Sequence, residues 1–183
     1  MIAKGKNMAN SQSLIAYFSR KGNNYLGGSI VHLPIGNSEV VAHKIQAITG
    51  SDLFQIQTVK SYSEDYTEAT IVAQDELSAD ARPKLVKMVD SMDSYEVMYL
   101  GYPNWWGTMP MAVFTFLDSY DFSGKTIVPY CTHEGSGLGS SEHDIKRLCP
   151  TAKVLSGLAI KGGTVGRADN DLVNWLKKLG LLS

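Results

Sequence analysis

Short apolar runs alternate with amphipathic stretches along the chain. Each apolar run is about as long as a β-strand and ends in polar, Gly- or Pro-rich sequence, a pattern typical of strands in a sheet covered on both faces. The expected strands are Ser13–Ser19, Asp52–Val59, Val97–Gly101, Thr126–Tyr130 and Lys153–Ile160.

Helical patterns occupy the stretches between these strands. Asn37 or Ser38 is suited to cap the first helix and Gly50 to end it, while Pro110 suits a first turn, where its missing N–H costs nothing. The expected helices lie at about Glu39–Thr49, near Ala69–Leu77, around Leu85–Val89, from Pro110 through Leu117, through Ile145 and Leu148, and at Asp169–Leu179. Strands alternating with helices predict an α/β three-layer sandwich around a five-stranded parallel sheet, with right-handed crossovers.

Length and composition narrow the class of protein. At 183 residues the chain fits one domain, which we expect over residues 13–183 after a flexible leader at residues 1–12. A net charge of −1 without a Lys/Arg stripe argues against nucleic acid as a partner. No apolar run is long enough to span a membrane and the leader does not read as a secretory signal, so we expect a cytoplasmic protein.

The two cysteines give no sign of special chemistry. Cys131 and Cys149 lie far apart without metal-ligand spacing, which argues against a zinc site and against a disulfide framework. We expect two buried or half-buried thiols and no metal centre.

Three loops that follow strands have the composition of a binding site. Ligands of an open parallel sheet bind at the carboxyl ends of its strands. Ser19–Ser38 offers N–H groups, hydroxyls and a helix N-terminus for an anion, and within it Arg20–Gly36 is expected to be irregular. Tyr102–Met109 offers aromatic faces, and Cys131–Ser141 offers glycines that let the backbone approach a flat ligand. Together they predict a site for a phosphate joined to a planar ring.

The middle loop carries a family resemblance. Residues 101–108 read Gly-Tyr-Pro-Asn-Trp-Trp-Gly-Thr, and the chain over nearly all of residues 13–180 resembles the flavodoxin-like FMN proteins, in particular a branch whose motif is Gly-Tyr-Pro-x-Trp-Trp-Gly-Thr. The resemblance implies the strand order 2-1-3-4-5 and FMN as the cofactor. It also implies that Pro103, Asn104, Trp105, Trp106 and Gly107 contact the isoalloxazine ring.

The phosphate loop departs from the family's pattern Ser/Thr-x-Thr-Gly-Asn-Thr. Ser19 begins correctly, but Lys21 replaces a threonine and no helix pattern follows. We interpret this as an insertion of about fourteen residues that splits the loop, so that Ser19 and Lys21 approach the phosphate from one side and Asn37 and Ser38 from the other. The alternative is that Gly22–Asn24 keeps the phosphate role and Gly36–Ser38 only caps a helix.

The third loop resembles the family's remaining flavin loop. From it, Thr132 and Gly135 are expected to contact the ring, and His133 is a candidate for proton transfer beside it because histidine titrates in the physiological range. The alternative for His133 is an ordinary hydrogen-bonding role. For the two tryptophans the alternatives are core packing and a homodimer contact.

Two functional classes fit this reading. The first is electron transfer by an FMN-binding carrier that docks a redox partner protein. The second is an NAD(P)H-dependent FMN oxidoreductase that reduces a quinone or another small acceptor. The near-neutral charge is unlike that of a carrier that attracts partners electrostatically, whereas nothing in the sequence identifies a nicotinamide site. A flavin-free interaction module on the same fold is a third class.

Overall fold

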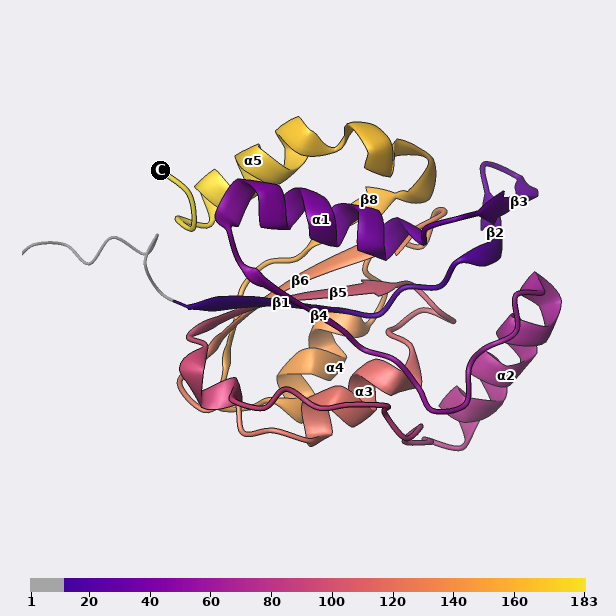
Figure 1. Cartoon of the computed structure of the whole chain (residues 1–183), viewed down its shortest axis with the longest axis horizontal. Coiled ribbons are helices and arrows are strands. Elements are labelled where there is room, and N and C mark those ends of the chain that lie inside the picture. Colours follow the sequence, from indigo (N-terminus) through magenta and orange to yellow (C-terminus); the bar gives the residue numbers. More distant parts are fainter. Residues whose placement is uncertain (1–11) are drawn as a thin grey trace, which may run out of the picture.

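A parallel sheet forms the centre of the computed structural model, which describes residues 12–183 (Figure 1). Its order is β4-β1-β5-β6-β7, with β8 also paired to β6, and every pair is parallel. The predicted α/β fold is confirmed, and this order agrees with 2-1-3-4-5 when β7 and β8 count as the fifth strand. The expected leader lies outside the described residues except for Gln12. The strands are β1 (Ser13–Tyr17), β4 (Asp52–Gln55), β5 (Val97–Pro103), β6 (Thr126–His133), β7 (Lys153–Val154) and β8 (Leu158–Lys161).

Helices cover both faces of the sheet. α1 (Asn37–Thr49) and α5 (Asp169–Lys178) lie on one face, and α3 (Met111–Asp118) and α4 (Ser141–Leu148) lie on the other (Figure 1). Each pair buries its apolar side against the sheet, which gives one core on each face. None of the helices within residues 12–183 has the length and apolar character needed to cross a membrane.

The remaining α-helix of the described residues, α2 (Tyr66–Ser78), lies beyond the carboxyl ends of the strands (Figure 1), and two short 3-10 helices, Met92–Ser94 and Gly162–Arg167, complete the helical elements. Asp65 caps it, since its side chain accepts a hydrogen bond from the N–H of Glu68 at 2.9 Å. α2 therefore lies at the edge of the sheet where a ligand is expected.

The segment Arg20–Gly36 is not irregular, as the sequence analysis expected. It forms an antiparallel hairpin of β2 (Gly22–Leu26) and β3 (Ser29–Leu33). Gly27 and Gly28 make the turn, both with positive φ. A two-residue Gly-Gly connection between β-forming residues is a known hairpin signal.

The predicted helix around Leu85–Val89 is also wrong, and the second strand is shorter than expected. β4 ends at Gln55, and residues 57–59 pair with residues 84–86 through an antiparallel bridge between Thr58 and Leu85. The N–H of Val86 donates to the carbonyl of Gln57 at 2.9 Å. These backbone groups therefore serve strand pairing, which a helix would exclude.

The predicted strand Lys153–Ile160 is split into β7 and β8. The chain leaves the sheet at Ser156 and Gly157, where the Ser156 carbonyl accepts from the indole N–H of Trp175 at 3.0 Å and the Gly157 N–H donates to Glu142. Pro129 of β6 lies at the break and has no N–H to offer the ladder.

Both cysteines are free and buried, as expected. Burial raises the pKa of each thiol to about 12. Because the thiolate is the reactive form, neither residue is suited to nucleophilic chemistry.

Candidate functional site

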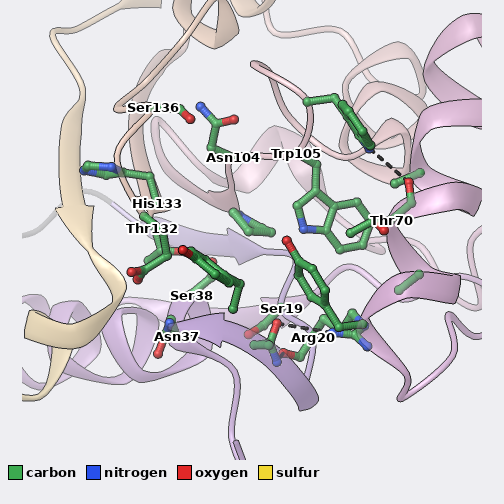
Figure 2. Close-up of a pocket in the computed structure, with 18 of the residues that line it drawn as sticks. Ser19, Arg20, Asn37, Ser38, Thr70, Asn104, Trp105, Thr132, His133 and Ser136 are labelled. Carbon is green, nitrogen blue, oxygen red and sulfur yellow. Dashed lines mark hydrogen bonds between the residues drawn. The ribbon is translucent and has the colours of Figure 1, made fainter. Parts of the chain in front are cut away.

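A cavity of about 540 Å³ lies at the carboxyl ends of β1, β5 and β6 (Figure 2). It draws residues from all three loops singled out in the sequence. Of the twelve predicted site residues, ten line it, namely Ser19, Asn37, Ser38, Pro103, Asn104, Trp105, Trp106, Gly107, Thr132 and His133.

The other two predicted residues lie outside the lining. The side chain of Lys21 is exposed to solvent, and its neighbour Arg20 lines the cavity instead. Gly135 is exposed, and its N–H donates to Nδ1 of His133 at 2.9 Å. Since Nδ1 accepts this bond, the neutral imidazole carries its proton on Nε2.

The sequence analysis missed the wall that the hairpin and α2 contribute. It selected no residue from β2, β3 or α2. Asn24 and Tyr25 of β2 and Tyr66, Ala69, Thr70 and Ala73 of α2 line the cavity, as do Arg20 before the hairpin and Glu134 and Ser136 of the third loop, none of which was predicted. The Gly-Gly turn signal would have placed Asn24 and Tyr25 on a strand, but only the three-dimensional arrangement brings α2 to the cavity.

The N-terminus of α1 faces one end of the cavity. Its cap residue is Gly36, which has no side chain that could cap the helix. The hydroxyl of Ser19 caps the helix instead, since it accepts a hydrogen bond from the N–H of Glu39 at 3.1 Å. A Cβ at Gly36 would meet the Ser19 hydroxyl oxygen at 2.2 Å, so only glycine fits beside the end of β1. Among the described residues, the N–H groups of Asn37 and Ser38 have no hydrogen-bond acceptor. Two N–H groups at the positive end of a helix are therefore available to an anion.

Two buried hydroxyls complete this end. Ser38 and Thr132 are hydrogen-bonded to each other at 2.8 Å, although they are 94 residues apart. Two hydroxyls that share one hydrogen bond keep one proton to donate. The pair can therefore add a third donor to the two N–H groups of α1.

A tyrosine from β6 fixes the first turn of α1. The Tyr130 hydroxyl donates to the carbonyl of Ser38 at 3.0 Å, and burial raises the pKa of this phenol well above its usual range. Its ring crosses Gly101 of β5, where a Cβ would lie 2.0 Å from the ring. Gly101 thus allows Tyr130 to reach α1.

Trp105 contributes the aromatic wall. Its ring packs edge-to-face with Phe18 at 5.1 Å and with Tyr62 at 5.0 Å between ring centroids. Figure 2 shows its indole pointing into the middle of the lining residues. These contacts fix its orientation, so a flat wall exists before any ligand arrives.

Trp106 joins the same loop to α2. Trp106 and Gly107 have positive φ in a tight turn closed by backbone hydrogen bonds between Trp105 and Thr108. The exposed indole of Trp106 donates to the carbonyl of Thr70 at 3.0 Å. Positive φ is strained for a tryptophan, and here it directs the side chain toward α2.

Asn104 joins the second loop to the third. Its Nδ2 donates to the carbonyl of Gly137 at 2.9 Å, and its Oδ1 accepts from the N–H of Gly107 at 3.0 Å. Its backbone N–H also donates to the carbonyl of Thr132. The side chain expected to serve the ring therefore also sets the spacing between two cavity loops.

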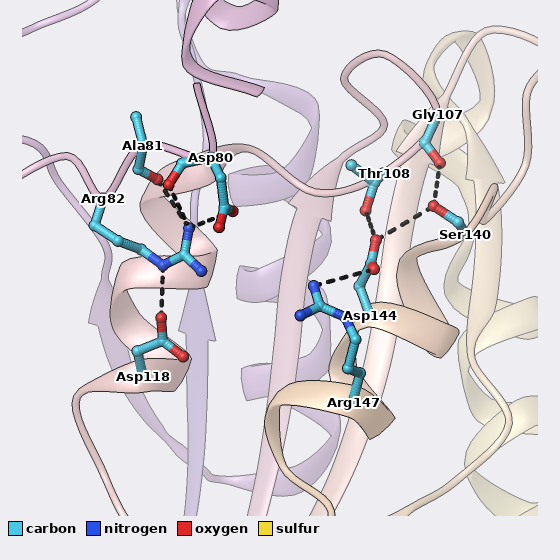
Figure 3. Close-up of polar contacts among 9 residues, drawn as sticks. All are labelled: Asp80, Ala81, Arg82, Gly107, Thr108, Asp118, Ser140, Asp144 and Arg147. Atoms are coloured by element: carbon cyan, nitrogen blue, oxygen red, sulfur yellow. Dashed lines mark hydrogen bonds and ion pairs between the residues drawn. The ribbon is translucent and has the colours of Figure 1, made fainter. Parts of the chain in front are cut away.

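Asp144 of α4 holds the same two loops from outside the cavity (Figure 3). Its carboxylate accepts from the hydroxyl of Thr108 at 2.6 Å and from that of Ser140 at 3.3 Å, and it pairs with Arg147. The Ser140 hydroxyl also donates to the carbonyl of Gly107. Asn104 and Asp144 therefore connect the second loop to the third independently of each other.

Arg82 fixes the end of α2 against α3 (Figure 3). Its guanidinium bonds Asp118 through Nε and Asp80 through Nη1. The hydrogen bond from Arg82 lowers the pKa of Asp80. This exposed pairing supports the position of α2 beside the cavity.

Arg20 fixes the base of the hairpin and the start of α2. Its guanidinium makes five hydrogen bonds, to the carbonyls of Ser63, Asp65 and Asn23 and to Oδ1 of Asn24. These bonds match its five N–H donors. Burial lowers the pKa of Arg20 and the nearby Asp65 opposes this shift, but an arginine stays charged in proteins. It therefore brings positive charge to the cavity wall without a free N–H for a ligand.

Comparison with known families shows what this architecture is. A sequence profile described as Flavodoxin matches residues 30–179, and the chain belongs to this flavodoxin family. A search of curated proteins found no match. The chain contains no group of three or more His, Cys, Asp or Glu residues able to hold a metal within the part that the structure describes.

Solved structures share the fold. A candidate flavoprotein from Bacteroides eggerthii is 25% identical, with a TM-score of 0.72 over 93% of this chain and 99% of that one. A flavoprotein from Lactobacillus acidophilus in complex with FMN is 18% identical, with a TM-score of 0.63 over 90% and 98%. An NADH:FMN oxidoreductase in its apo form is 14% identical, with a TM-score of 0.53 over 91% and 85%.

Replacing Asn104 with alanine tests how the loops are spaced. The change removes both side-chain hydrogen bonds and leaves the Gly137 carbonyl without this donor. We expect the free energy of unfolding, measured by urea denaturation, to fall by about 1–3 kcal/mol. The exposed Asn170 of α5 provides the control, and Asn170→Ala should change stability by less than about 0.5 kcal/mol. Equal effects of the two substitutions would contradict the role given to Asn104.

Proposed function

We propose that this chain is an FMN-binding flavodoxin-type protein that takes part in electron transfer. The observation that carries the proposal is one cavity with an anion site at the start of α1 and a fixed aromatic wall at Trp105. The family and the fold shared with an FMN complex support the choice of ligand. FMN, when bound, supplies one- and two-electron redox chemistry.

The residues at the first end of the cavity fit a phosphate. The N–H groups of Asn37 and Ser38 and the remaining proton of the Ser38–Thr132 pair are donors, which a phosphate requires. Lys21 lies outside the lining, so the proposed set is Ser19, Asn37, Ser38 and Thr132, with Ser19 acting by fixing the start of α1. We therefore favour the split phosphate loop, which is supported by the position of Gly22–Asn24 in β2 rather than at a helix start.

The opposite part of the cavity fits the ring. Trp105 offers a fixed face, and Pro103 and Gly107 bring backbone close to the same space. His133, whose Nδ1 is held by the Gly135 N–H, is assigned a hydrogen-bonding role at Nε2. α2 and the hairpin reduce the access of water to this space.

Titration of the apo-protein with FMN and with riboflavin tests this assignment. We expect FMN to bind more tightly than riboflavin, because only FMN carries the terminal phosphate that fills the α1 site. Ser38→Ala should weaken FMN binding about tenfold and riboflavin binding less than about twofold. Flavin fluorescence quenching and calorimetry measure both affinities.

Lys21→Ala is the matched control for this titration, and it should leave FMN affinity unchanged because Lys21 lies outside the cavity. Failure of the wild-type protein to bind FMN would refute the proposal. A loss of FMN affinity in Lys21→Ala without a loss in Ser38→Ala would refute the proposed phosphate site.

A second candidate is an NAD(P)H-dependent FMN oxidoreductase that reduces a quinone or another small acceptor. The observation that favours it is the wall made by Tyr25 of the hairpin and Tyr66 of α2, whose ring centroids lie 6.3 Å apart. A cavity enclosed on this side offers aromatic surface to a small acceptor, which a carrier that docks proteins does not need.

Measuring how the flavin is reduced separates the two candidates. For a carrier we expect reduction by NADPH to require a flavodoxin reductase, with little direct oxidation of NADPH or NADH in the presence of quinone. Free FMN at the same concentration is the control for reactions in solution. Rapid direct turnover of NAD(P)H with quinone would exclude the carrier and establish the oxidoreductase.

A further inference from the structure

The outer edge of β3 is open to solvent. Its residues from Ser29 to His32 are exposed, and Leu33 is half-buried. The strand contains no Lys, Arg, Asp, Glu or Pro, although such residues usually protect an exposed sheet edge. Four of the nine exposed large hydrophobic side chains of the described residues belong to this hairpin and the segment after it, namely Tyr25, Ile30, Val31 and Ile35.

The register of the hairpin shows which backbone groups of β3 point outward. In a hairpin with a two-residue turn, the two residues that flank the turn are hydrogen-bonded to each other, here Leu26 and Ser29. Hydrogen-bonded pairs then alternate with non-hydrogen-bonded pairs along the two strands. Ile30 and His32 therefore direct their N–H and C=O groups away from β2. None of these four groups has a hydrogen-bond partner among the described residues.

The opposite edge of the hairpin is anchored to the rest of the molecule. Asn23 of β2 points outward by the same alternation, and its N–H donates to the carbonyl of Glu64 at 3.0 Å. Its carbonyl accepts from Nη1 of Arg20 at 2.6 Å. β2 also packs against α2, and Figure 1 shows the hairpin with β2 on the side of α2. β3 is therefore the edge at which a further strand can be added, and added strands stabilise a two-stranded sheet.

The sequence of β3 is suited to pairing with a second copy of itself. When two antiparallel β3 strands are centred on Val31, Ile30 of each copy lies opposite His32 of the other. These are the residues whose N–H and C=O groups point outward, so both pairs can exchange two backbone hydrogen bonds. The two Val31 side chains meet at the centre, and no carboxylate or ammonium group opposes a like charge. Backbone and side chains thus both fit a two-fold axis at Val31.

We infer that β3 is a dimerisation edge, at which two copies of this chain join their hairpins into one four-stranded antiparallel sheet. The inference goes beyond the proposed function and does not depend on a bound ligand. Residues directly opposite each other on paired strands point to the same face of the sheet, so Ile30 shares a face with Tyr25, which lines the cavity. The second copy's His32 lies opposite Ile30 on that face. The dimer therefore extends the cavity wall that the hairpin provides.

Substitutions at the two-fold axis test the inference, because residue 31 faces its own copy there. Sedimentation velocity should show a wild-type dimer at about 100 µM that dissociates on dilution, since one pair of strands makes a small interface. Val31→Lys and Val31→Glu each bring like charges together and should weaken dimerisation by more than about tenfold. An equimolar mixture of the two variants should recover the dimer, because Lys in one copy then faces Glu in the other.

Ile71→Lys is the matched control, because Ile71 is an exposed apolar residue of α2 outside the hairpin; this variant should dimerise as the wild-type protein does. Ile30→Pro removes an outward N–H from each copy and leaves the hydrogen bonds between β2 and β3 in place. It should also weaken dimerisation, and it decides if the charged variants do not fold, as judged by circular dichroism.

Three results would overturn the inference. The first is a wild-type protein that stays monomeric, which would leave the edge of β3 to an extended segment of another protein. The second is a dimer that folded Val31→Lys, Val31→Glu and Ile30→Pro all retain, because the contact would then lie elsewhere. The third is a mixture of the two charged variants that stays monomeric although each is folded, because residue 31 would then not face its own copy.

Discussion

The hydrogen bond between the hydroxyls of Ser38 and Thr132 joins the first turn of α1 to the end of β6. Tyr130 reinforces this junction by donating to the carbonyl of Ser38, and Ser19 at the end of β1 accepts from the third N–H of the helix. The helix N-terminus, with its unpaired N–H groups, therefore has one fixed position over the sheet. Glycine at positions 36 and 101 is what allows this approach, because a Cβ at either would overlap Ser19 or Tyr130. The position of these N–H groups at the edge of the cavity depends on this junction.

The β2–β3 hairpin forms part of the cavity wall. A two-stranded sheet is only marginally stable by itself, and here Arg20 fixes its base while Glu134 holds its turn. Arg20 also donates hydrogen bonds to the carbonyls of Ser63 and Asp65, which precede α2. One guanidinium therefore fixes both the hairpin and the start of α2. The hairpin lies between Ser19 and α1 in the sequence, while the Ser19 hydroxyl still accepts from the N–H of Glu39 in α1. It also encloses the space beside Trp105, which bears on whether the protein passes electrons to another protein or to a small acceptor.

Much of the fold could be predicted from the sequence because its signals are local. Apolar runs of strand length and the Pro110 and Gly50 helix signals each lie within a few residues, and the strand order came with the resemblance. The loops at the strand ends could be assigned to one site because parallel strands bring their carboxyl ends to the same edge. The hairpin was missed although its Gly27–Gly28 turn was also a local signal.

The remaining features depend on contacts between distant residues. Arg20 bonds a carbonyl 43 residues away, and Trp106 bonds one 36 residues away in α2; neither pairing leaves a pattern in the sequence. Lys21 was expected at the site, but its side chain is exposed and its neighbour Arg20 lines the cavity. The split of the fifth strand likewise depends on Glu142 and Trp175 from helices on either face.

Phosphorus NMR of the FMN complex tests most directly whether the phosphate binds at the start of α1. The second pKa of a free phosphate monoester is about 6, so the resonance of free FMN moves between pH 5 and pH 8. Hydrogen bonds from N–H and hydroxyl donors stabilise the dianion and lower that pKa. The account predicts a bound resonance that is shifted from that of free FMN and does not change over this pH range. A bound resonance that titrates like that of free FMN would contradict it, because the phosphate would then lie in solvent.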